Sequence, residues 1–156
     1  MQIMYTIELI QAISDWQQGG NKEQKSARGI KLKEVASLLP EKFRSKEALC
    51  YRRISLDKSA VWSIGTNLHI KETISSWTED ISVAKNFKGG VPKIGYQGAI
   101  FKIEETDGSV ILNLHKLFQD KEFAAFVEKN KNNVNGYKKG MGKYLDSQKE
   151  VIIQIT

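Results

Sequence analysis

The sequence predicts a single α+β domain in which helices come first and most of the strands follow. The 156 residues match the size of one ordinary domain. Apolar residues before Pro40 recur at helical spacing, whereas the chain after Pro40 contains short β-branched and aromatic runs. The regular strand–helix alternation of a parallel α/β sheet does not occur. These observations favour the α+β class.

Two helices are expected before Pro40. The inward face of the first is a stripe of apolar residues spaced by three or four: Ile3, Ile7, Ile10, Ile13 and Trp16. Gly19 and Gly20 end this helix. A solvated stretch, 21–29, then leads to a second helix, which Pro40 ends. The inward face of the second helix has four residues at the same spacing: Leu32, Val35, Ala36 and Leu39.

Strands and two further helices are expected after Pro40. The strand patterns cover 49–54, 72–77, 97–103, 109–112 and 150–156. One helix has Thr78 as N-cap and ends at Gly89-Gly90, and the other runs from 120 to 130. Their inward residues are Val83, Ala84 and Phe87 in the first helix and Phe123, Phe126 and Val127 in the second. The Gly/Asn/Lys-rich segment 130–142 is expected to form one long loop, of a kind that is often functional.

Composition excludes several classes of protein. One cysteine, Cys50, cannot form an intramolecular disulfide, and with only His69 and His115 it cannot build a typical zinc site. Cys50 lies in an apolar strand and is expected to be a buried structural thiol. The apolar runs are too short to span a bilayer, and no basic region of a secretory signal precedes them. We expect a metal-free cytoplasmic protein that does not associate with membranes.

Two nucleotide-binding motifs are absent. The segment 137–144 superficially resembles a phosphate loop, but Gly136 and Gly142 are one residue too far apart. In addition, Tyr144 follows Lys143 where a Walker loop requires Ser or Thr. No G-x-G-x-x-G motif follows a strand, which excludes a Rossmann dinucleotide site.

Three short motifs on predicted strands carry possible chemistry: Tyr51-Arg52-Arg53, Ser76-Trp77-Thr78 and Gln148-Lys149-Glu150. Arg52 shares a strand face with apolar neighbours, and a buried guanidinium needs an anion such as a pyrophosphate. Ser76 and Thr78 share one strand face, and Trp77 points to the other, where it is expected to pack. Gln148 and Glu150 also share a face, roughly 7 Å apart.

In this order, the three motifs resemble those of the R-S-E class of ADP-ribosyltransferases, the clade of arginine- and Rho-modifying bacterial toxins and phage transferases. That family has an aromatic-Arg pair on the first core strand, then Ser-x-Ser/Thr before an A-x-x-F helix, and finally E-x-E or Q-x-E. Here Ser-Trp-Thr replaces the commoner Ser-Thr-Ser, and Gln148 replaces the first Glu. The resemblance implies a catalytic core over 48–156, with two packed, mainly antiparallel sheets and an NAD cleft between them. Residues 1–45 would form a helical cap.

The resemblance also implies NAD as co-substrate and assigns a role to each matched residue. Arg52 would bind the NAD phosphates, and the backbone of Arg53 would contact the nicotinamide amide. Ser76 would orient Glu150, and Glu150 would stabilise an oxocarbenium-like ribose through the 2′-OH. Nicotinamide leaves from a cationic ring, so no general acid is required. Four more residues are candidates for NAD binding: Thr78, Phe87, Lys93 and Tyr96.

The acceptor is expected to be a macromolecule. The Gln148 amide can donate and accept hydrogen bonds but cannot take a proton, which suits asparagine or the edge of a nucleobase. The net charge of +6 and the acid-free segment 129–143 favour RNA or single-stranded DNA over a protein Asn or Arg side chain. Candidate acceptor-binding residues are Gln148, Tyr137, Tyr144, Lys138, Lys139 and Lys143.

Four biological settings fit such an enzyme: a toxin–antitoxin pair, phage defence, a phage-encoded modifier, or a secreted effector that other machinery delivers. An antitoxin or immunity protein is a possible partner in the first two. The alternative from another functional class is a non-catalytic, basic nucleic-acid-binding domain.

Overall fold

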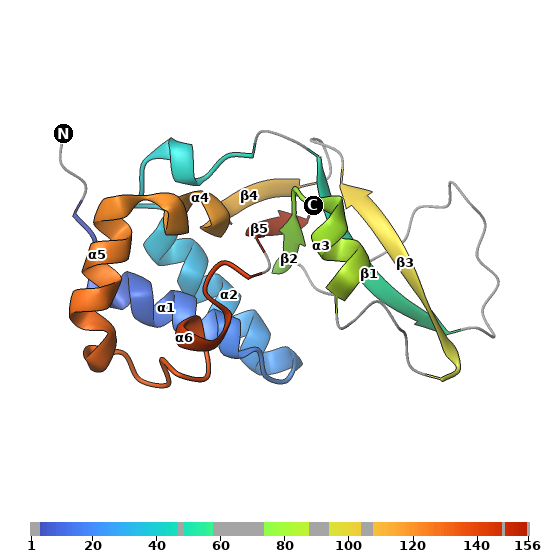
Figure 1. Ribbon diagram of the computed structural model, residues 1–156, viewed down its shortest axis with the longest axis horizontal. Helices are drawn as coiled ribbons and strands as arrows, with labels where there is room; N and C mark the ends of the chain where they lie inside the picture. Colours follow the sequence, from blue (N-terminus) through green and yellow to red (C-terminus); the bar gives the residue numbers. More distant parts are fainter. Residues whose placement is uncertain are drawn as a thin grey trace.

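Two helices precede the sheet in the computed structural model, which describes residues 4–46, 49–57, 74–87, 94–103, 108–147 and 149–155 (Figure 1). Helix α1 spans Ile7–Gln18 and begins where Thr6 accepts a hydrogen bond from the Leu9 N–H. Helix α2 spans Lys22–Ala36. The stretch 21–27 is exposed, as expected, but it is helical from Lys22, because Asn21 and Gln24 form a capping box that starts the helix there.

The strands form one antiparallel sheet of five strands in the order β3-β1-β2-β5-β4. Their bounds are Cys50–Asp57 for β1, Ile74–Thr78 for β2, Tyr96–Ile103 for β3, Gly108–Asn113 for β4 and Glu150–Ile155 for β5. The five expected strands are confirmed. The expected pair of packed sheets was wrong, because β2 pairs with β5 on one edge and with β1 on the other, which links all the strands.

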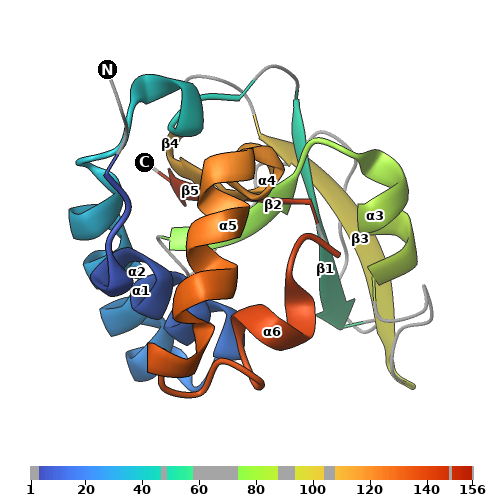
Figure 2. The ribbon, with the colours of Figure 1, turned by 60° about the vertical axis from the view of Figure 1, so that its left-hand side comes forward.

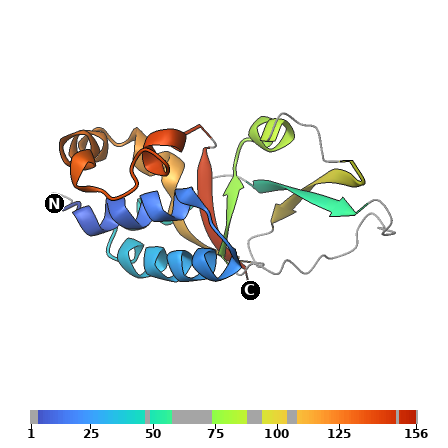
Figure 3. The ribbon, with the colours of Figure 1, turned by 90° about the horizontal axis from the view of Figure 1, so that it is seen from below.

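The link between β1 and β2 is narrow. β1 pairs with β3 along its whole length, from Cys50↔Ile103 to Asp57↔Tyr96. The described pairing between β1 and β2 is confined to Tyr51↔Thr78. Beyond this pair the β1–β3 ladder turns away from β2, β5 and β4, so the sheet forks (Figure 3).

The main core lies between the helices and the β2–β5–β4 part of the sheet. Helices α1 and α2 contribute Ile10, Ile13 and Leu32, and the sheet contributes Leu112 and Ile152. The opposite sheet face has a smaller apolar cluster, formed by Cys50, Trp77, Ile103, Val151 and Ile153. The predicted packing role of Trp77, on the face opposite Ser76, is therefore confirmed.

Two helices were predicted in the second half of the chain, and both are present with changed starts. Helix α3 spans Ile81–Asn86 and has Asp80 as its N-cap, not Thr78. The Thr78 hydroxyl instead accepts a hydrogen bond from the Asp80 N–H, in the turn that precedes α3. Helix α5 spans Lys121–Asn130, with Asp120 as N-cap. Gly89 and Gly90, the expected end of the earlier helix, lie outside the described residues.

Short helical elements complete the fold. They are α4 at Leu114–Gln119, α6 at Met141–Tyr144, and the 3₁₀ turns η1 at Glu41–Phe43 and η4 at Lys131–Asn133. None of these was predicted, because segments this short show no clear apolar period.

The segment 130–142 is not the long open loop that its composition predicted. Val134 and Met141 are buried in the main core. The Met141 N–H donates to Ser14 Oγ over 3.1 Å, and helix α6 packs next to α1 (Figure 2). Gly140 is required at this contact, since a Cβ there would lie 2.1 Å from the Ser14 carbonyl oxygen. The segment is therefore fixed to α1.

Candidate functional site

A cavity of about 440 Å³ opens where the sheet forks. Strands β1, β2 and β5 form its floor, and the turn between α1 and α2 forms a wall, with Gly19, Gly20 and Lys25 among the lining residues. The cavity brings together residues from all three sequence motifs, which are Arg52, Arg53, Ser76, Thr78 and Glu150. Two further candidates, Phe87 and Tyr144, also line it. Of the remaining candidates, Gln148 and Lys93 lie outside the described residues.

Glu150 is the acidic residue of this cavity. Its side chain is buried, with 6% of the residue exposed, and its Oε2 accepts hydrogen bonds from Ser76 Oγ and from Trp16 Nε1. The register explains the first contact: Thr78 pairs with Glu150 and Ser76 with Ile152, so Ser76 lies diagonally across from Glu150 on the same face. A buried carboxylate with two donors is held in one orientation.

Trp16 is a functional candidate that the sequence analysis did not identify. The helical period correctly placed it on the inward face of α1, but that period cannot show what its indole N–H contacts. The Nε1–Oε2 distance to Glu150 is 2.7 Å, across 134 residues of sequence. Trp16 is the one residue of the predicted stripe with a polar side-chain atom, and a buried indole N–H normally finds an acceptor. This need for an acceptor is the feature of the sequence that could have identified Trp16 as a candidate.

Three basic residues line the cavity: Lys25, Arg52 and Arg53. Arg52 comes from β1 and is half-buried, next to buried Cys50, as its strand phase predicted. Lys25 comes from the exposed first turn of α2 and was not predicted as a site residue, because the sequence does not show that α2 borders the cavity. Arg52 and Lys25 thus each bring a positive charge to the cavity lining, which suits an anion such as a phosphate group.

The side chain of Arg53 has a separate task. Its Nη1 donates to the Lys85 carbonyl over 2.9 Å, which joins β1 to α3. The guanidinium lies directly over Gly98, where an added Cβ would be 2.4 Å from Nη2. The role expected for Arg53 is a contact made by its backbone. The side-chain contacts described here are compatible with that role and do not test it.

The other NAD candidates divide into two groups. Thr78 is buried and lines the cavity, and Phe87, at the end of α3, also lines it while 38% exposed. Tyr96 begins β3, is 42% exposed, and does not line the cavity. Among the described residues, the structure therefore brings Thr78 and Phe87, but not Tyr96, to Glu150.

Among the candidate acceptor-binding residues, some line the cavity and others do not. Tyr144, at the end of α6, lines the cavity, and the Lys143 ammonium lies 5.2 Å from the centre of its ring. Lys138 and Lys139 are exposed on the turn before α6 and lie outside the cavity lining. They can contact a large acceptor only beyond the cavity.

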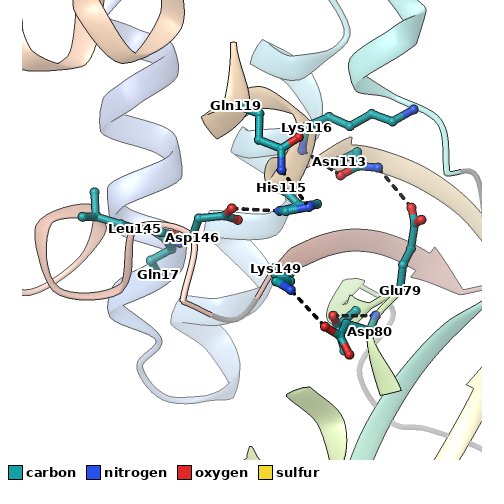
Figure 4. A network of polar contacts seen from close by, with 11 residues as sticks. Gln17, Glu79, Asp80, Asn113, His115, Lys116, Gln119, Leu145, Asp146 and Lys149 are labelled. Atoms are coloured by element: carbon teal, nitrogen blue, oxygen red, sulfur yellow. Dashed lines mark hydrogen bonds and ion pairs between the residues drawn. The ribbon is translucent and has the colours of Figure 1, made fainter. Parts of the chain in front are cut away.

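The turn that leads into β5 is held by polar contacts at both ends (Figure 4). Asp146 Oδ2 lies 2.8 Å from His115 Nδ1, and Lys149 Nζ donates to Asp80 Oδ2 over 3.0 Å. Leu145 and Lys149 have positive φ angles of 44° and 43°, a conformation that costs energy in non-glycine residues. These contacts fix the approach of the chain to Glu150.

Several pKa values are shifted outside the cavity. Burial raises the pKa of Asp146, against the opposing effect of His115. Hydrogen bonds from Ser82 and Lys149 lower the pKa of Asp80 to about 2. Burial raises the pKa of the Cys50 thiol to about 12 and Cys50 is fully enclosed, which confirms the prediction of a buried thiol.

A metal cluster and a membrane span were also sought. No group of His, Cys, Asp and Glu side chains within the described ranges could hold a metal ion. Nor is any helix in this part of the chain long and apolar enough to cross a membrane.

Comparison with known proteins identifies no relative. No family model, curated protein or solved structure matches this chain. The functional argument therefore depends on the residues of the cavity.

Proposed function

We propose that this protein is an NAD-dependent mono-ADP-ribosyltransferase. One observation carries the proposal: Ser76 donates a hydrogen bond to buried Glu150 inside a cavity that Arg52 also lines. The three residues come from different strands, and all three line the same cavity. A chance likeness of three short motifs would not require them to share a cavity.

The chemistry needs an anion beside the ribose. The bond between the nicotinamide nitrogen and ribose C1′ breaks, and nicotinamide leaves as a neutral molecule with the bonding electrons. Positive charge then develops on C1′ and the ring oxygen, where the ionised carboxylate of Glu150 stabilises it. A nucleophilic atom of the acceptor forms the new bond to C1′ and loses a proton.

The remaining lining residues fit the rest of NAD. Arg52 would present a planar fork to the pyrophosphate, and Lys25 supplies a further positive charge to the cavity lining. Phe87 and Tyr144 offer aromatic surface to the nicotinamide or the acceptor. A volume of about 440 Å³ lies within the usual range of small-molecule sites.

The favoured acceptor is RNA or single-stranded DNA. Support comes from the net charge of +6 and from Lys138 and Lys139, which are exposed on the segment that leads to Tyr144. Tyr144 could stack on an unpaired base at the cavity mouth. Such an enzyme would act as a toxin, a defence factor or a phage-encoded modifier in the cytoplasm. An antitoxin or immunity protein would be its partner in the first two cases.

The test is turnover of labelled NAD by the wild-type protein, with total RNA, single-stranded DNA and total protein as acceptors. Glu150→Gln should reduce nicotinamide release by at least about 100-fold, the scale of losing one electrostatic contact in a preorganised site. Glu122→Gln, on the exposed face of α5, is the matched control and should behave as wild type.

Two outcomes would redirect the proposal. Label on a protein Asn or Arg side chain, resistant to nuclease, would change the acceptor and keep the enzyme class. Binding of RNA without any nicotinamide release would favour the non-catalytic nucleic-acid-binding domain and refute the proposed activity.

A further inference from the structure

We propose that Trp16 is a positioning residue for Glu150, so that α1 belongs to the catalytic machinery. This inference rests on the proposed transferase function. The contact that supports it is the hydrogen bond from Trp16 Nε1 to Glu150 Oε2, at 2.7 Å.

The two donors to Glu150 act on the same atom. Ser76 Oγ and Trp16 Nε1 both donate to Oε2. Among the described hydrogen bonds, none uses Oε1 as acceptor, and Glu150 lines the cavity. Oε1 is therefore the oxygen available to a ligand hydroxyl, such as the ribose 2′-OH. Two donors on Oε2, from different elements, restrict rotation of the carboxylate about its last torsion angle more than Ser76 can alone.

The indole is itself held in place. Trp16 follows Ile10 and Ile13 on the inward face of α1, so the helix supplies the direction of the side chain. Gly29 of α2 lies against the ring: a Cβ at position 29 would be 3.1 Å from Trp16 Cζ3 and 3.1 Å from Ile74 Cγ2. The absence of a side chain at Gly29 lets α2 and β2 confine the ring between them.

The geometry also explains why tryptophan is needed. An indole N–H donates and cannot accept, so its partner must offer a lone pair, which a carboxylate oxygen does. Phenylalanine would keep an aromatic ring on the inward face of α1 and remove the donor, but it would also lose the outer indole carbons, including Cζ3, that lie against Gly29. The folding of Trp16→Phe is therefore measured by urea unfolding, and the comparison of kcat with KM separates positioning of Glu150 from packing of α1.

The kinetic test compares Trp16→Phe with a control that loses a similar bond elsewhere. Tyr5 donates to Asp120 Oδ2 over 2.6 Å in the main core, so Tyr5→Phe removes another aromatic donor to a carboxylate. Trp16→Phe should lower kcat by about 10- to 100-fold, the range for losing a hydrogen bond to a charged group, with less effect on the KM for NAD. Tyr5→Phe should leave both constants unchanged. An unchanged kcat in folded Trp16→Phe, or a loss confined to KM, would overturn the proposal.

A second measurement does not depend on activity. Tryptophan occurs three times in the chain, so the indole N–H region of a ¹H–¹⁵N spectrum is simple to assign with Trp16→Phe. Glu150→Gln replaces a charged acceptor with a neutral one and should shift the Trp16 indole signal upfield. A Trp16 signal that does not move would refute the contact itself. If the signal moves but wild-type protein releases no nicotinamide, the proposed function fails and the contact stands.

Discussion

Asp146 Oδ2 lies 2.8 Å from His115 Nδ1, a contact that ties the turn before β5 to helix α4. The other ring nitrogen of His115 lies 3.0 Å from Gln119 Nε2. Asp146 Oδ1 is buried and has no hydrogen-bond partner among the described residues. Oδ2 of Asp146 is thus held by the contact with His115, whereas Oδ1 is shielded from water without a hydrogen bond to replace it.

Asp146→Asn should stabilise the protein near neutral pH. Burial raises the pKa of Asp146 in the folded state, so folding favours its protonated form. The stability that this group contributes is present below its unfolded pKa and is lost as the pH rises through the folded value. Asparagine keeps an acceptor for His115 and removes the buried charge. Urea unfolding at pH 7 should show a higher midpoint for the variant.

The same experiment at about pH 3, below the unfolded pKa of an aspartate, is the control, because Asp146 is then protonated in both states. The advantage of the variant should disappear there. A variant that is less stable than wild type at pH 7 only would show that the contact between the Asp146 carboxylate and His115 outweighs the cost of burial.

Arg52→Lys should weaken NAD binding by about tenfold while the protein stays folded. Lysine keeps the positive charge but loses the planar pair of donors that fits a pyrophosphate. Calorimetric titration of NAD into both proteins measures the difference. Lys42→Arg, in the distant turn η1, controls for a change between the two basic side chains. Equal affinities would make Arg52 a structural residue and remove it from the site.

Cys50 should resist alkylation in the native state. Its pKa is raised to about 12 and the residue is fully buried, so almost no thiolate is present at pH 8 and reagent cannot approach it. Mass spectrometry after iodoacetamide treatment should find unmodified protein, whereas protein unfolded in urea should be alkylated fully. Rapid labelling without urea would indicate that β1 opens locally.

Changing Lys138 and Lys139 together to Gln should reduce modification of nucleic acid and leave NAD hydrolysis intact. Both lysines are exposed and lie outside the cavity lining. For single-stranded acceptor, the slope of log affinity against log salt should fall by about 1.4, the contribution of two phosphate contacts. The corresponding change of Lys42 and Lys121, on other elements, is the control. An equal effect in both variants would indicate attraction by net charge alone.

The sequence predicted local features better than long-range ones. Short β-branched and aromatic runs identified each strand, and the stripe ending in Trp16 identified α1. The single sheet was missed because it depends on the Tyr51↔Thr78 pair, and no local pattern records which strands become neighbours. Helix α4 was missed because six residues contain too little of a period.

The site residues also divide into those that a local motif predicted and those that only long-range contacts reveal. The family-like motifs led to Arg52, Ser76 and Glu150, and the structure places all three in one cavity. Trp16 and Lys25 were not predicted as site residues because they belong to the segment 1–45, which was expected to form a separate helical cap. Their contribution appears only when α1 and α2 fold against the sheet.

The position of β5 has a consequence for protein synthesis. β5 is the last strand of the described sheet to be synthesised, yet it lies between β2 and β4. A nascent chain that has not yet emerged from the ribosome through residue 155 has no partner for the inner edges of either strand. It also lacks the carboxylate that Ser76 and Trp16 hold. The site would therefore form only once β5 is inserted between β2 and β4.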